Sequence, residues 1–154
     1  MSETDLWTTE RLLTTAARLT ENAWNERLLA IGITHASFIT LRSIEAHGPL
    51  SQVELAEHLH VTAQTVGRTL VRLEQQGLLL RQSSEHDRRT FRVSLTQLGR
   101  MRLAEAERHE REFMLDLHRA SPELRPLLME LIEDLLPTRR QTEDNVAGQP
   151  DRNG

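Results

Sequence analysis

The 154-residue chain contains no cysteine, few aromatic residues and no long apolar run. The lack of cysteine excludes disulfide bonds, thiolate metal sites and thiol-based redox switches. No apolar stretch approaches the roughly 18 residues of a membrane-spanning helix, and the N-terminus lacks the charged and then apolar layout of a signal peptide. We therefore expect a soluble, cytoplasmic protein that makes no contact with a membrane.

The usual marks of an enzyme are also missing. The chain has no glycine-rich loop of the kind that holds phosphates and no cysteine nucleophile, and its serines fall at expected helix caps or turns. We therefore predict no catalytic residues, no cofactor and no enzymatic activity. His35, Glu107, His109 and Glu110 could in principle converge on a zinc ion, but no ligand spacing motif supports this, and we predict no metal site.

Positive charge is concentrated in one segment of an otherwise acidic chain. The formal net charge is −4, yet residues 62–92 contain six arginines against three acidic residues. A basic element on an acidic protein favours contact with a polyanion, because the rest of the surface repels it. An ordinary fluctuation of charge along the sequence is the alternative explanation.

Apolar periodicity predicts a mainly α-helical fold. Leucine and alanine recur at helical spacing over residues 5–30, and a second helix is expected from Thr34 to the "HGPL" sequence, where glycine and proline end it. Ser51 and Glu54 form the signature of a capping box at the start of a third helix. The positions of this third helix that are expected to face inward are Val53, Leu55, Ala56 and Leu59.

A fourth helix follows after a very short turn, with Thr62 as its expected N-cap and Gly77 as its C-terminal stop. Two short helices joined in this way are typical of a helix-turn-helix, whose second helix enters the major groove of DNA. An ordinary amphipathic hairpin of helices would show the same apolar pattern. The inward stripe is Val66, Leu70 and Leu73, and the opposite, small or polar face is Ala63, Gln64, Thr65, Gly67, Arg68, Thr69 and Arg72.

Two details of the fourth helix favour the helix-turn-helix. Gly67 is less favourable than alanine inside a helix by about 1 kcal/mol, and it lies where a bulky side chain would hold a partner surface away. The first turn carries no acidic residue, although the helix dipole favours one there. A helix N-terminus without carboxylates suits a neighbouring phosphate.

The segment after Gly77 has the pattern of a β-hairpin, with strands expected at Leu78–Arg81 and Thr90–Leu95. Its residues expected to face inward are Phe91, Val93 and Leu95. The long polar turn should protrude as a wing, with Arg88 and Arg89 near its tip, where they can reach phosphates or a narrow minor groove. Asp87 is expected to orient one of these arginines through a charge-assisted hydrogen bond.

Two more helices are expected at the C-terminal end. Thr96 should cap a long helix to about Arg119, and Ser121 with Pro122 should begin a last helix that runs to about Leu136. The apolar positions of the long helix are Leu98, Leu103, Ala106, Phe113, Met114 and Leu117. The terminal helices contain more leucine than one small core can bury. They could pack on one another within one chain, but we favour packing against a second copy, since a twofold dimer places two reading helices about 34 Å apart on DNA.

The predicted fold is therefore mainly α with a small β-hairpin wing. Residues 34–95 form a winged helix-turn-helix domain, and residues 5–32 and 96–137 form terminal dimerisation helices, all within a single domain over residues 1–137. Residues 138–154 are polar and contain glycine and proline, so we expect a disordered tail.

The order of these elements resembles the MarR family of bacterial winged-helix repressors over roughly residues 5–137. The resemblance is carried by the sequences "LAEHLHVTAQTVGRTLVRLEQQGLLLR" and "DRRTFRVSLTQLGR". The second matches the wing signature of the family at Asp87, Arg89, Leu95, Thr96 and Gly99. Relatives often carry a basic or hydroxyl residue where this chain has Ala63, and a hydroxyl where it has Gly67, and both departures bear on base preference.

The resemblance implies a homodimer, joined through its first and last two helices, that binds a pseudo-palindromic site in double-stranded DNA. It also implies that Arg89 is the wing-tip arginine of the minor groove and that Asp87 orients it. Gln64 could bind adenine through two hydrogen bonds, which discriminate against other bases by about 1–3 kcal/mol. The full set of residues expected to contact DNA is Gln64, Thr65, Arg68, Thr69, Arg72, Asp87, Arg88 and Arg89.

Members of the family commonly respond to small aromatic acids bound between the dimerisation helices and the winged domain. The candidate lining of such an effector site is Trp24, His35, Phe38, Arg42 and His109. Each has a simpler explanation, because Trp24 and Phe38 could belong to the core and Arg42 could be a solvated helix residue.

The function predicted from the sequence is sequence-specific regulation of transcription by a repressor that a ligand releases from its operator. The alternative is a winged-helix module that binds a protein partner instead of DNA. Such a module would not need Arg88 and Arg89 at the tip of its wing.

Overall fold

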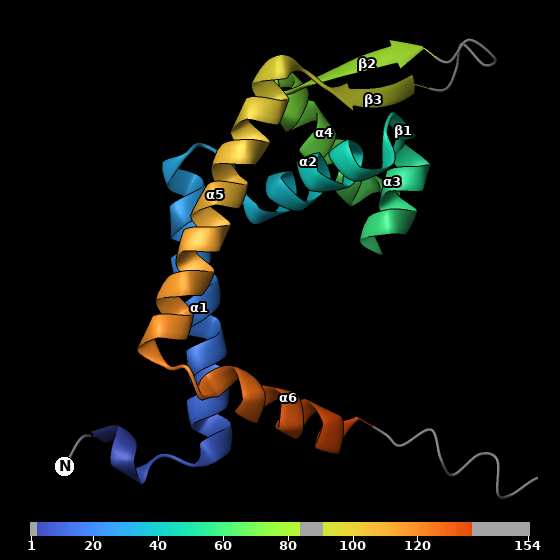
Figure 1. Cartoon of the computed structure of the whole chain (residues 1–154). Helices are drawn as coiled ribbons and strands as arrows, with labels where there is room; N and C mark the ends of the chain where they lie inside the picture. The colour runs from blue at the N-terminus through green and yellow to red at the C-terminus, as the bar shows by residue number, and fades with distance from the viewer. Residues whose placement is uncertain (1–2, 84–90, 137–154) are drawn as a thin grey trace, which may run out of the picture. The chain divides into compact units, whose positions relative to one another are not determined.

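The computed structural model describes residues 3–83 and 91–136 and divides the chain into two compact units, Met1–Phe113 and Met114–Gly154. The first unit contains a short 3-10 helix, helices α1 to α4, three strands and the first part of α5 (Figure 1). The second contains the end of α5 and α6. In chain order the elements are η1 (Glu3–Leu6), α1 (Thr9–Ala30), α2 (His35–His47), β1 (Leu50–Ser51), α3 (Gln52–Leu59), α4 (Ala63–Gln75), β2 (Leu79–Ser83), β3 (Phe91–Leu95), α5 (Gln97–Ala120) and α6 (Leu124–Leu135).

Hydroxyl side chains cap the helices of the first unit, as the sequence predicts for three of them. Thr62 Oγ1 accepts a hydrogen bond from the Thr65 amide at 3.2 Å, which fixes the start of α4. Thr96 Oγ1 accepts one from the Gly99 amide at 2.9 Å at the start of α5. The capping box of α3 is complete, because Ser51 and Glu54 each bind the backbone amide of the other.

The strands form one antiparallel sheet in the order β1-β3-β2. The predicted hairpin is confirmed, with Leu79 opposite Leu95 and Ser83 opposite Phe91. The sequence did not predict β1, in which Leu50 lies opposite Val93. A two-residue strand has no periodicity of its own, and its pairing depends on a partner more than 40 residues away. The winged helix-turn-helix fold is therefore confirmed.

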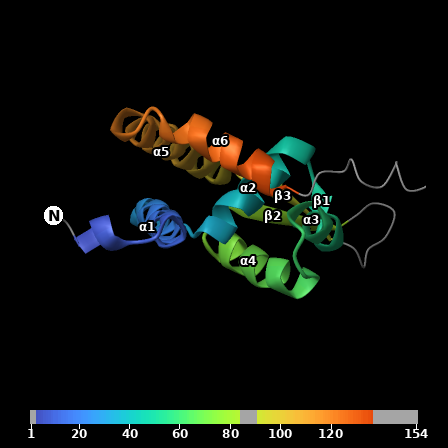
Figure 2. The same cartoon turned by 90° about the horizontal axis from the view of Figure 1, so that it is seen from below.

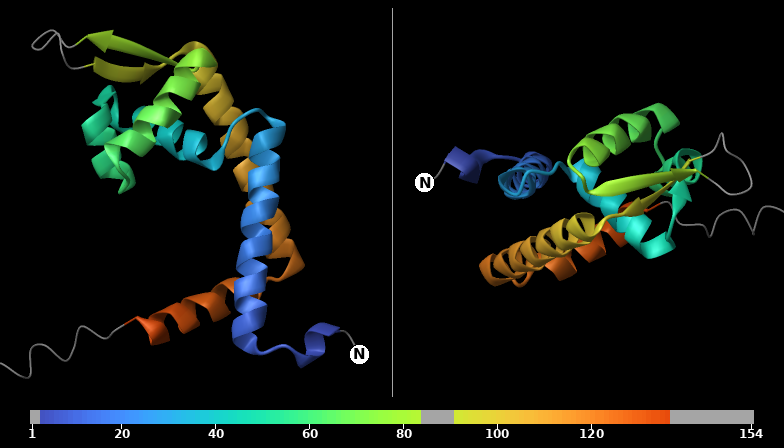
Figure 3. Two further views of the ribbon diagram at one scale, coloured as in Figure 1. Left: turned by 180° about the vertical axis from the view of Figure 1, so that it is seen from behind. Right: turned by 90° about the horizontal axis from the view of Figure 1, so that it is seen from above.

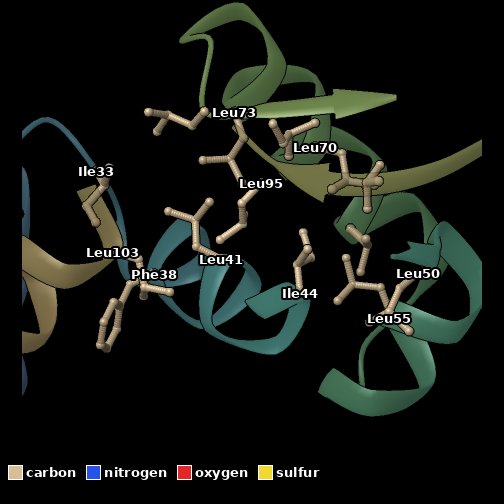
Figure 4. Close-up of a cluster of buried hydrophobic side chains, with 14 of the residues drawn as sticks. Ile33, Phe38, Leu41, Ile44, Leu50, Leu55, Leu70, Leu73, Leu95 and Leu103 are labelled. Atoms are coloured by element: carbon tan, nitrogen blue, oxygen red, sulfur yellow. The ribbon is translucent and has the colours of Figure 1, made fainter. Parts of the chain in front are cut away.

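The core of the first unit lies between α2, α3, α4 and the sheet, and α5 contributes Leu103 to it (Figure 4). The predicted inward stripe of α4 is buried throughout: Val66, Leu70 and Leu73. Seen from below, α2 lies on the inner side of α4, which leaves the other face of α4 at the edge of the unit (Figure 2). The core therefore holds α4 by one face only.

Several positions of the predicted apolar patterns are exposed. Val53 is 59 % exposed and Phe91 is 51 % exposed, although both continue an apolar pattern. Each lies at the end of its element, α3 or β3, where the periodic pattern continues beyond the neighbours that could cover it. On α5, Leu98 and Met114 are exposed as well, whereas Leu103 and Phe113 are buried.

Backbone contacts join the end of α4 to the start of α5. Thr96 donates hydrogen bonds to two carbonyls of the turn after α4, from Oγ1 to Gly77 O at 2.7 Å and from its amide to Leu78 O at 3.1 Å. A β-carbon at Gly99 would lie only 1.9 Å from Leu78 O. The glycine of the "LTQLG" motif is therefore required by a direct approach of α5 to another backbone segment. We call this junction, formed by Gly77, Leu78, Thr96 and Gly99, the α4–α5 joint.

The described part of the second unit, residues 114–136, exposes most of its apolar side chains. Helix α6 has no buried residue, and its exposed large apolar residues are Leu124, Leu127, Met129, Ile132 and Leu135. The predicted helix start at Ser121 and Pro122 is wrong by a few residues, because Pro122 and Glu123 form a turn and α6 begins at Leu124. No described helix is both long and apolar enough to cross a membrane. The expected tail, residues 138–154, lies outside the described residues.

Candidate nucleic-acid interface

The outer face of α4 carries the residues that the sequence predicts to read DNA. Gln64, Thr65, Arg68 and Arg72 are exposed, and Thr69 is partly exposed. A shallow groove runs along this face and is lined by Gln52, Gln64, Gly67, Arg68, Val71 and Arg81. Two predicted DNA-contacting residues thus share one surface with Gln52 of α3 and Arg81 of β2, neither of which the sequence singles out.

The turn between α3 and α4 is short because His60 adopts a left-handed conformation, with φ of 54°. The amide of the next residue, Val61, donates to Ala56 O at 3.1 Å, which closes the end of α3. Thr62 then caps α4 at once. This geometry fixes the angle between the two helices over only three residues.

The four described arginines of the basic segment fall into two groups. Arg81 Nε lies 3.0 Å from Glu74 Oε2, and Arg92 Nη2 lies 3.1 Å from Glu54 Oε1, so these charges are paired within the chain. Arg68 and Arg72 make no ion pair with any other described residue. The uncompensated positive charge of the described segment therefore lies on the outer face of α4. Asp87, Arg88 and Arg89 lie outside the described residues.

Arg92 fastens the wing strand β3 to the start of α3. Its Nη1 donates to Pro49 O at 2.6 Å, and its Nη2 contacts the Glu54 carboxylate, whose other oxygen accepts from the Ser51 amide at 2.7 Å. The Ser51 backbone amide is the main cause that lowers the pKa of Glu54, followed by the Ser51 hydroxyl, with Arg92 adding a smaller contribution. Burial opposes the shift. The sequence predicts the capping box but gives no sign that Arg92 joins it.

Replacing Glu54 with glutamine is expected to reduce stability in a pH-dependent way. The pKa of Glu54 is lower in the folded protein, so its carboxylate stabilises the fold above the unfolded pKa of about 4.3, and this contribution is lost as the pH falls through the folded pKa. At about pH 7 the variant should be less stable by about 0.5 kcal/mol, since the group is well solvated. Urea unfolding at several pH values measures the difference, which should vanish in acid. Glu57→Gln, on the same helix but outside the capping box, is the control, and an equal pH-dependent loss in both variants would contradict the assignment.

Comparison with known proteins finds similarity to one family of transcription regulators. The model of the MarR family matches residues 33–91, which include α2, the helix-turn-helix and the beginning of β3. Uncharacterized HTH-type transcriptional regulators of Bacillus cereus and Bacillus thuringiensis are 39 % identical over 82 residues, which is 53 % of this chain and 54 % of theirs. A mutant of Escherichia coli MarR complexed with operator DNA is 26 % identical, with a TM-score of 0.68 over 87 % of this chain and 97 % of that one. Residues 33–91 of this chain therefore match the MarR family.

The chain spans about half the length of the curated HTH-type relatives that it matches. MepR of Staphylococcus aureus is similar in fold, with a TM-score of 0.73 over 84 % of this chain and 99 % of that one at 21 % identity. The match to a family of transcription regulators agrees with the expectation that the chain is not an enzyme.

The residues expected to line an effector site are only partly brought together. Trp24 contacts Phe38 edge-on, with ring centroids 5.5 Å apart, and the Arg42 guanidinium lies over the Phe38 ring at 4.1 Å. Phe38 is only 1 % exposed and belongs to the core. Trp24 also stacks on Phe113 at 5.9 Å, a partner on α5 that the sequence does not indicate for it.

The remaining candidate effector residues lie on α2 and α5. Arg42 forms an ion pair with Glu110, and its Nε lies 3.9 Å from Glu107 Oε1. The charge of its guanidinium is therefore already paired with acidic side chains of α5. His35 is exposed, and His109 Nδ1 lies 3.8 Å from Glu112 on its own helix. Within residues 3–83 and 91–136, no three histidine, aspartate or glutamate side chains lie close enough together to hold a metal ion.

Proposed function

We propose that this protein is a sequence-specific regulator of transcription that binds double-stranded DNA. The observation that carries the proposal is the outer face of α4, which is exposed and is held rigidly by a buried inner face and a three-residue turn. It carries two arginines that pair with no acidic side chain among residues 3–83 and 91–136. A helix presented in this way fits the major groove. The mutant of E. coli MarR that is similar to this chain was crystallised with operator DNA.

Within this proposal, different residues have different tasks. Gln64 and Thr65, near the start of α4, contact base edges, because the first turns of a recognition helix enter the groove most deeply. Arg68, Thr69 and Arg72 contact the bases or the phosphates beside them. Arg88 and Arg89 bind the minor groove or its phosphates, and Asp87 orients Arg89.

The proposal extends to a homodimer that represses transcription in the cytoplasm until a ligand releases it. The exposed apolar residues of α6 supply a surface that a second copy could cover. An effector, for which a small aromatic acid is the candidate class, would act by binding more tightly to a form of the dimer whose two α4 helices do not fit the operator spacing.

Selection of DNA fragments from a random pool tests the function directly. The expected product is a short pseudo-palindrome, bound with an affinity that falls steeply with salt, at a logarithmic slope of roughly −0.9 for each phosphate neutralised. An absence of enrichment, together with no binding of duplex DNA at low salt, would refute the proposal. The Arg89→Ala variant distinguishes a DNA-binding regulator from a protein-binding module. If the wing contacts DNA, the variant should bind the selected fragment at least about tenfold more weakly than the wild type.

Gln64→Ala is expected to relax base preference at one position of each half-site. A glutamine that binds adenine through two hydrogen bonds contributes about 1–3 kcal/mol of discrimination, equal to roughly a fivefold to 150-fold change in selectivity. Repeating the selection with the variant measures the change. Gln75→Ala is the matched control, since Gln75 is exposed on the same helix but at its far end. If the wild type and Gln64→Ala selected identical sequences, Gln64 would not contribute to base recognition.

A further inference from the structure

Gln52, the first residue of α3, reaches across to the start of α4. Its Nε2 donates a hydrogen bond to the carbonyl oxygen of Ala63 at 2.7 Å, and Ala63 is the first residue of α4. A helical carbonyl has a second lone pair, so it can accept this bond while it also serves the helix. The bond therefore ties the first turn of α3 to the first turn of the reading helix.

Gly67 makes room for the Gln52 amide. A β-carbon at Gly67 would lie 2.8 Å from Nε2, 3.4 Å from Cδ and 3.5 Å from Oε1 of Gln52. The whole amide group thus lies against the glycine, in the space that a side chain at position 67 would fill. The sequence attributes this glycine to close approach of a partner surface, whereas the structure shows a partner within the same chain.

The Gln52 amide lies among the residues that the proposed function assigns to DNA. It shares the groove of α4 with Gln64 and Arg68. Hydrogen bonds to base edges hold only over donor–acceptor distances of roughly 2.7–3.2 Å, so a small shift of the first turn of α4 breaks them. A bond that fixes this turn against α3 therefore bears on recognition without any contact between Gln52 and a base.

We propose that Gln52 and Gly67 form a matched pair that sets the position of α4, and that Gln52 is a positioning residue for DNA recognition. The proposal rests on the proposed function, because its effect is expressed through the contacts of Gln64 and Arg68. Gln52 acts through the Ala63 carbonyl, and Gly67 allows it to do so by carrying no side chain.

A double-mutant cycle with Gln52→Ala and Gly67→Ala tests the pair. The affinities of the four proteins for a selected DNA fragment and for an unrelated fragment are measured by fluorescence anisotropy, well below their unfolding temperatures. Gln52→Ala should weaken specific binding about tenfold and leave non-specific binding nearly unchanged, because base contacts need a placed helix and phosphate contacts tolerate a shifted one. Gly67→Ala should have a similar effect, since its methyl group displaces the amide.

The double variant decides between positioning and independent roles. It should bind the selected fragment no more weakly than Gln52→Ala, because the methyl group then enters space that the amide has vacated. Multiplied effects would overturn the pairing, and unchanged specificity in Gln52→Ala would overturn the positioning role. Should Gly67→Ala fail to fold alone, the pairing requires that adding Gln52→Ala restores folding.

Gln97→Ala is the matched control, because Gln97 is also the first residue of a helix, α5, and is exposed away from α4. Its specific affinity should equal that of the wild type. If the wild-type protein bound no duplex DNA, the proposed function itself would be refuted. If the wild type and Gln52→Ala bound the selected fragment with equal affinity, only the positioning role of Gln52 would be refuted.

Discussion

Replacing Gly99 with alanine should lower the free energy of unfolding by about 3 kcal/mol or more, which is large for the addition of one methyl group. The new β-carbon would lie 1.9 Å from the carbonyl oxygen of Leu78 and 2.9 Å from its carbonyl carbon. Neither atom belongs to a flexible side chain that can turn away. Relief requires that α5 move as a whole or that the chain after α4 change its path.

The surroundings of Leu78 oppose such a change. Its amide donates to Leu73 O at 2.9 Å, its carbonyl accepts from the Thr96 amide, and its side chain is buried. The preceding residue, Gly77, has φ of 70° and holds the Thr96 hydroxyl through its own carbonyl. The backbone of the α4–α5 joint is therefore held by several hydrogen bonds and by a buried side chain. No neighbouring group can move at low energetic cost to make room for the added methyl group.

Chemical denaturation of Gly99→Ala and Gly67→Ala measures the effect. Both glycines are helical, so both substitutions gain similar helix propensity, but the β-carbon at position 67 meets only the end of the Gln52 side chain. Gly67→Ala should change stability by less than about 1 kcal/mol. Equal stabilities of the two variants would mean that the close approach at Gly99 is not a constraint.

Replacing Phe38 with alanine is expected to cost about 3–5 kcal/mol of stability, as for other large aromatic residues of a core. Phe38 is 1 % exposed, contacts Trp24 edge-on and lies beneath the Arg42 guanidinium. Truncation would leave a cavity and remove both contacts. The prediction also decides how the candidate effector residues are to be understood, because a side chain that lines an open ligand site contributes far less to folding.

Urea unfolding of Phe38→Ala, Phe38→Leu and Phe91→Ala separates these possibilities. Phe38→Leu should cost less than about 1.5 kcal/mol, since it keeps most of the volume. Phe91→Ala is the matched control, because that ring is 51 % exposed on β3, and its loss should cost about 1 kcal/mol or less. If Phe38→Ala were as stable as Phe91→Ala, we would conclude that Phe38 lines an open ligand site and does not belong to the core.

The elements that the sequence predicts well are those with local signals. The inward stripe of α4 and the capping box of Ser51 and Glu54 depend on residues three or four apart, and both are confirmed. The strand β1 was missed because it is defined by pairing with β3. Val53 and Phe91 were misjudged because periodicity says which face is apolar but not where the covering neighbours end.

The candidate site shows the same division. Exposure of Gln64, Arg68 and Arg72 follows from the helical pattern and could be predicted. The bond from Gln52 to Ala63 and the pairing of Arg92 with Glu54 join residues 11 and 38 positions apart, so no local pattern indicates them. Gly67 was correctly recognised as unusual, but its partner could be found only from the three-dimensional contacts.

The α4–α5 joint has a mechanical consequence. Side chains between two helices can change rotamer and absorb a small movement, but here the first turn of α5 lies directly against the main chain that follows α4. Figure 3 shows the start of α5 beside the end of α4 from two sides. We therefore expect that a displacement of the first turn of α5 also moves the C-terminal end of α4. Such a displacement would change the position of the helix that carries the candidate DNA-reading residues.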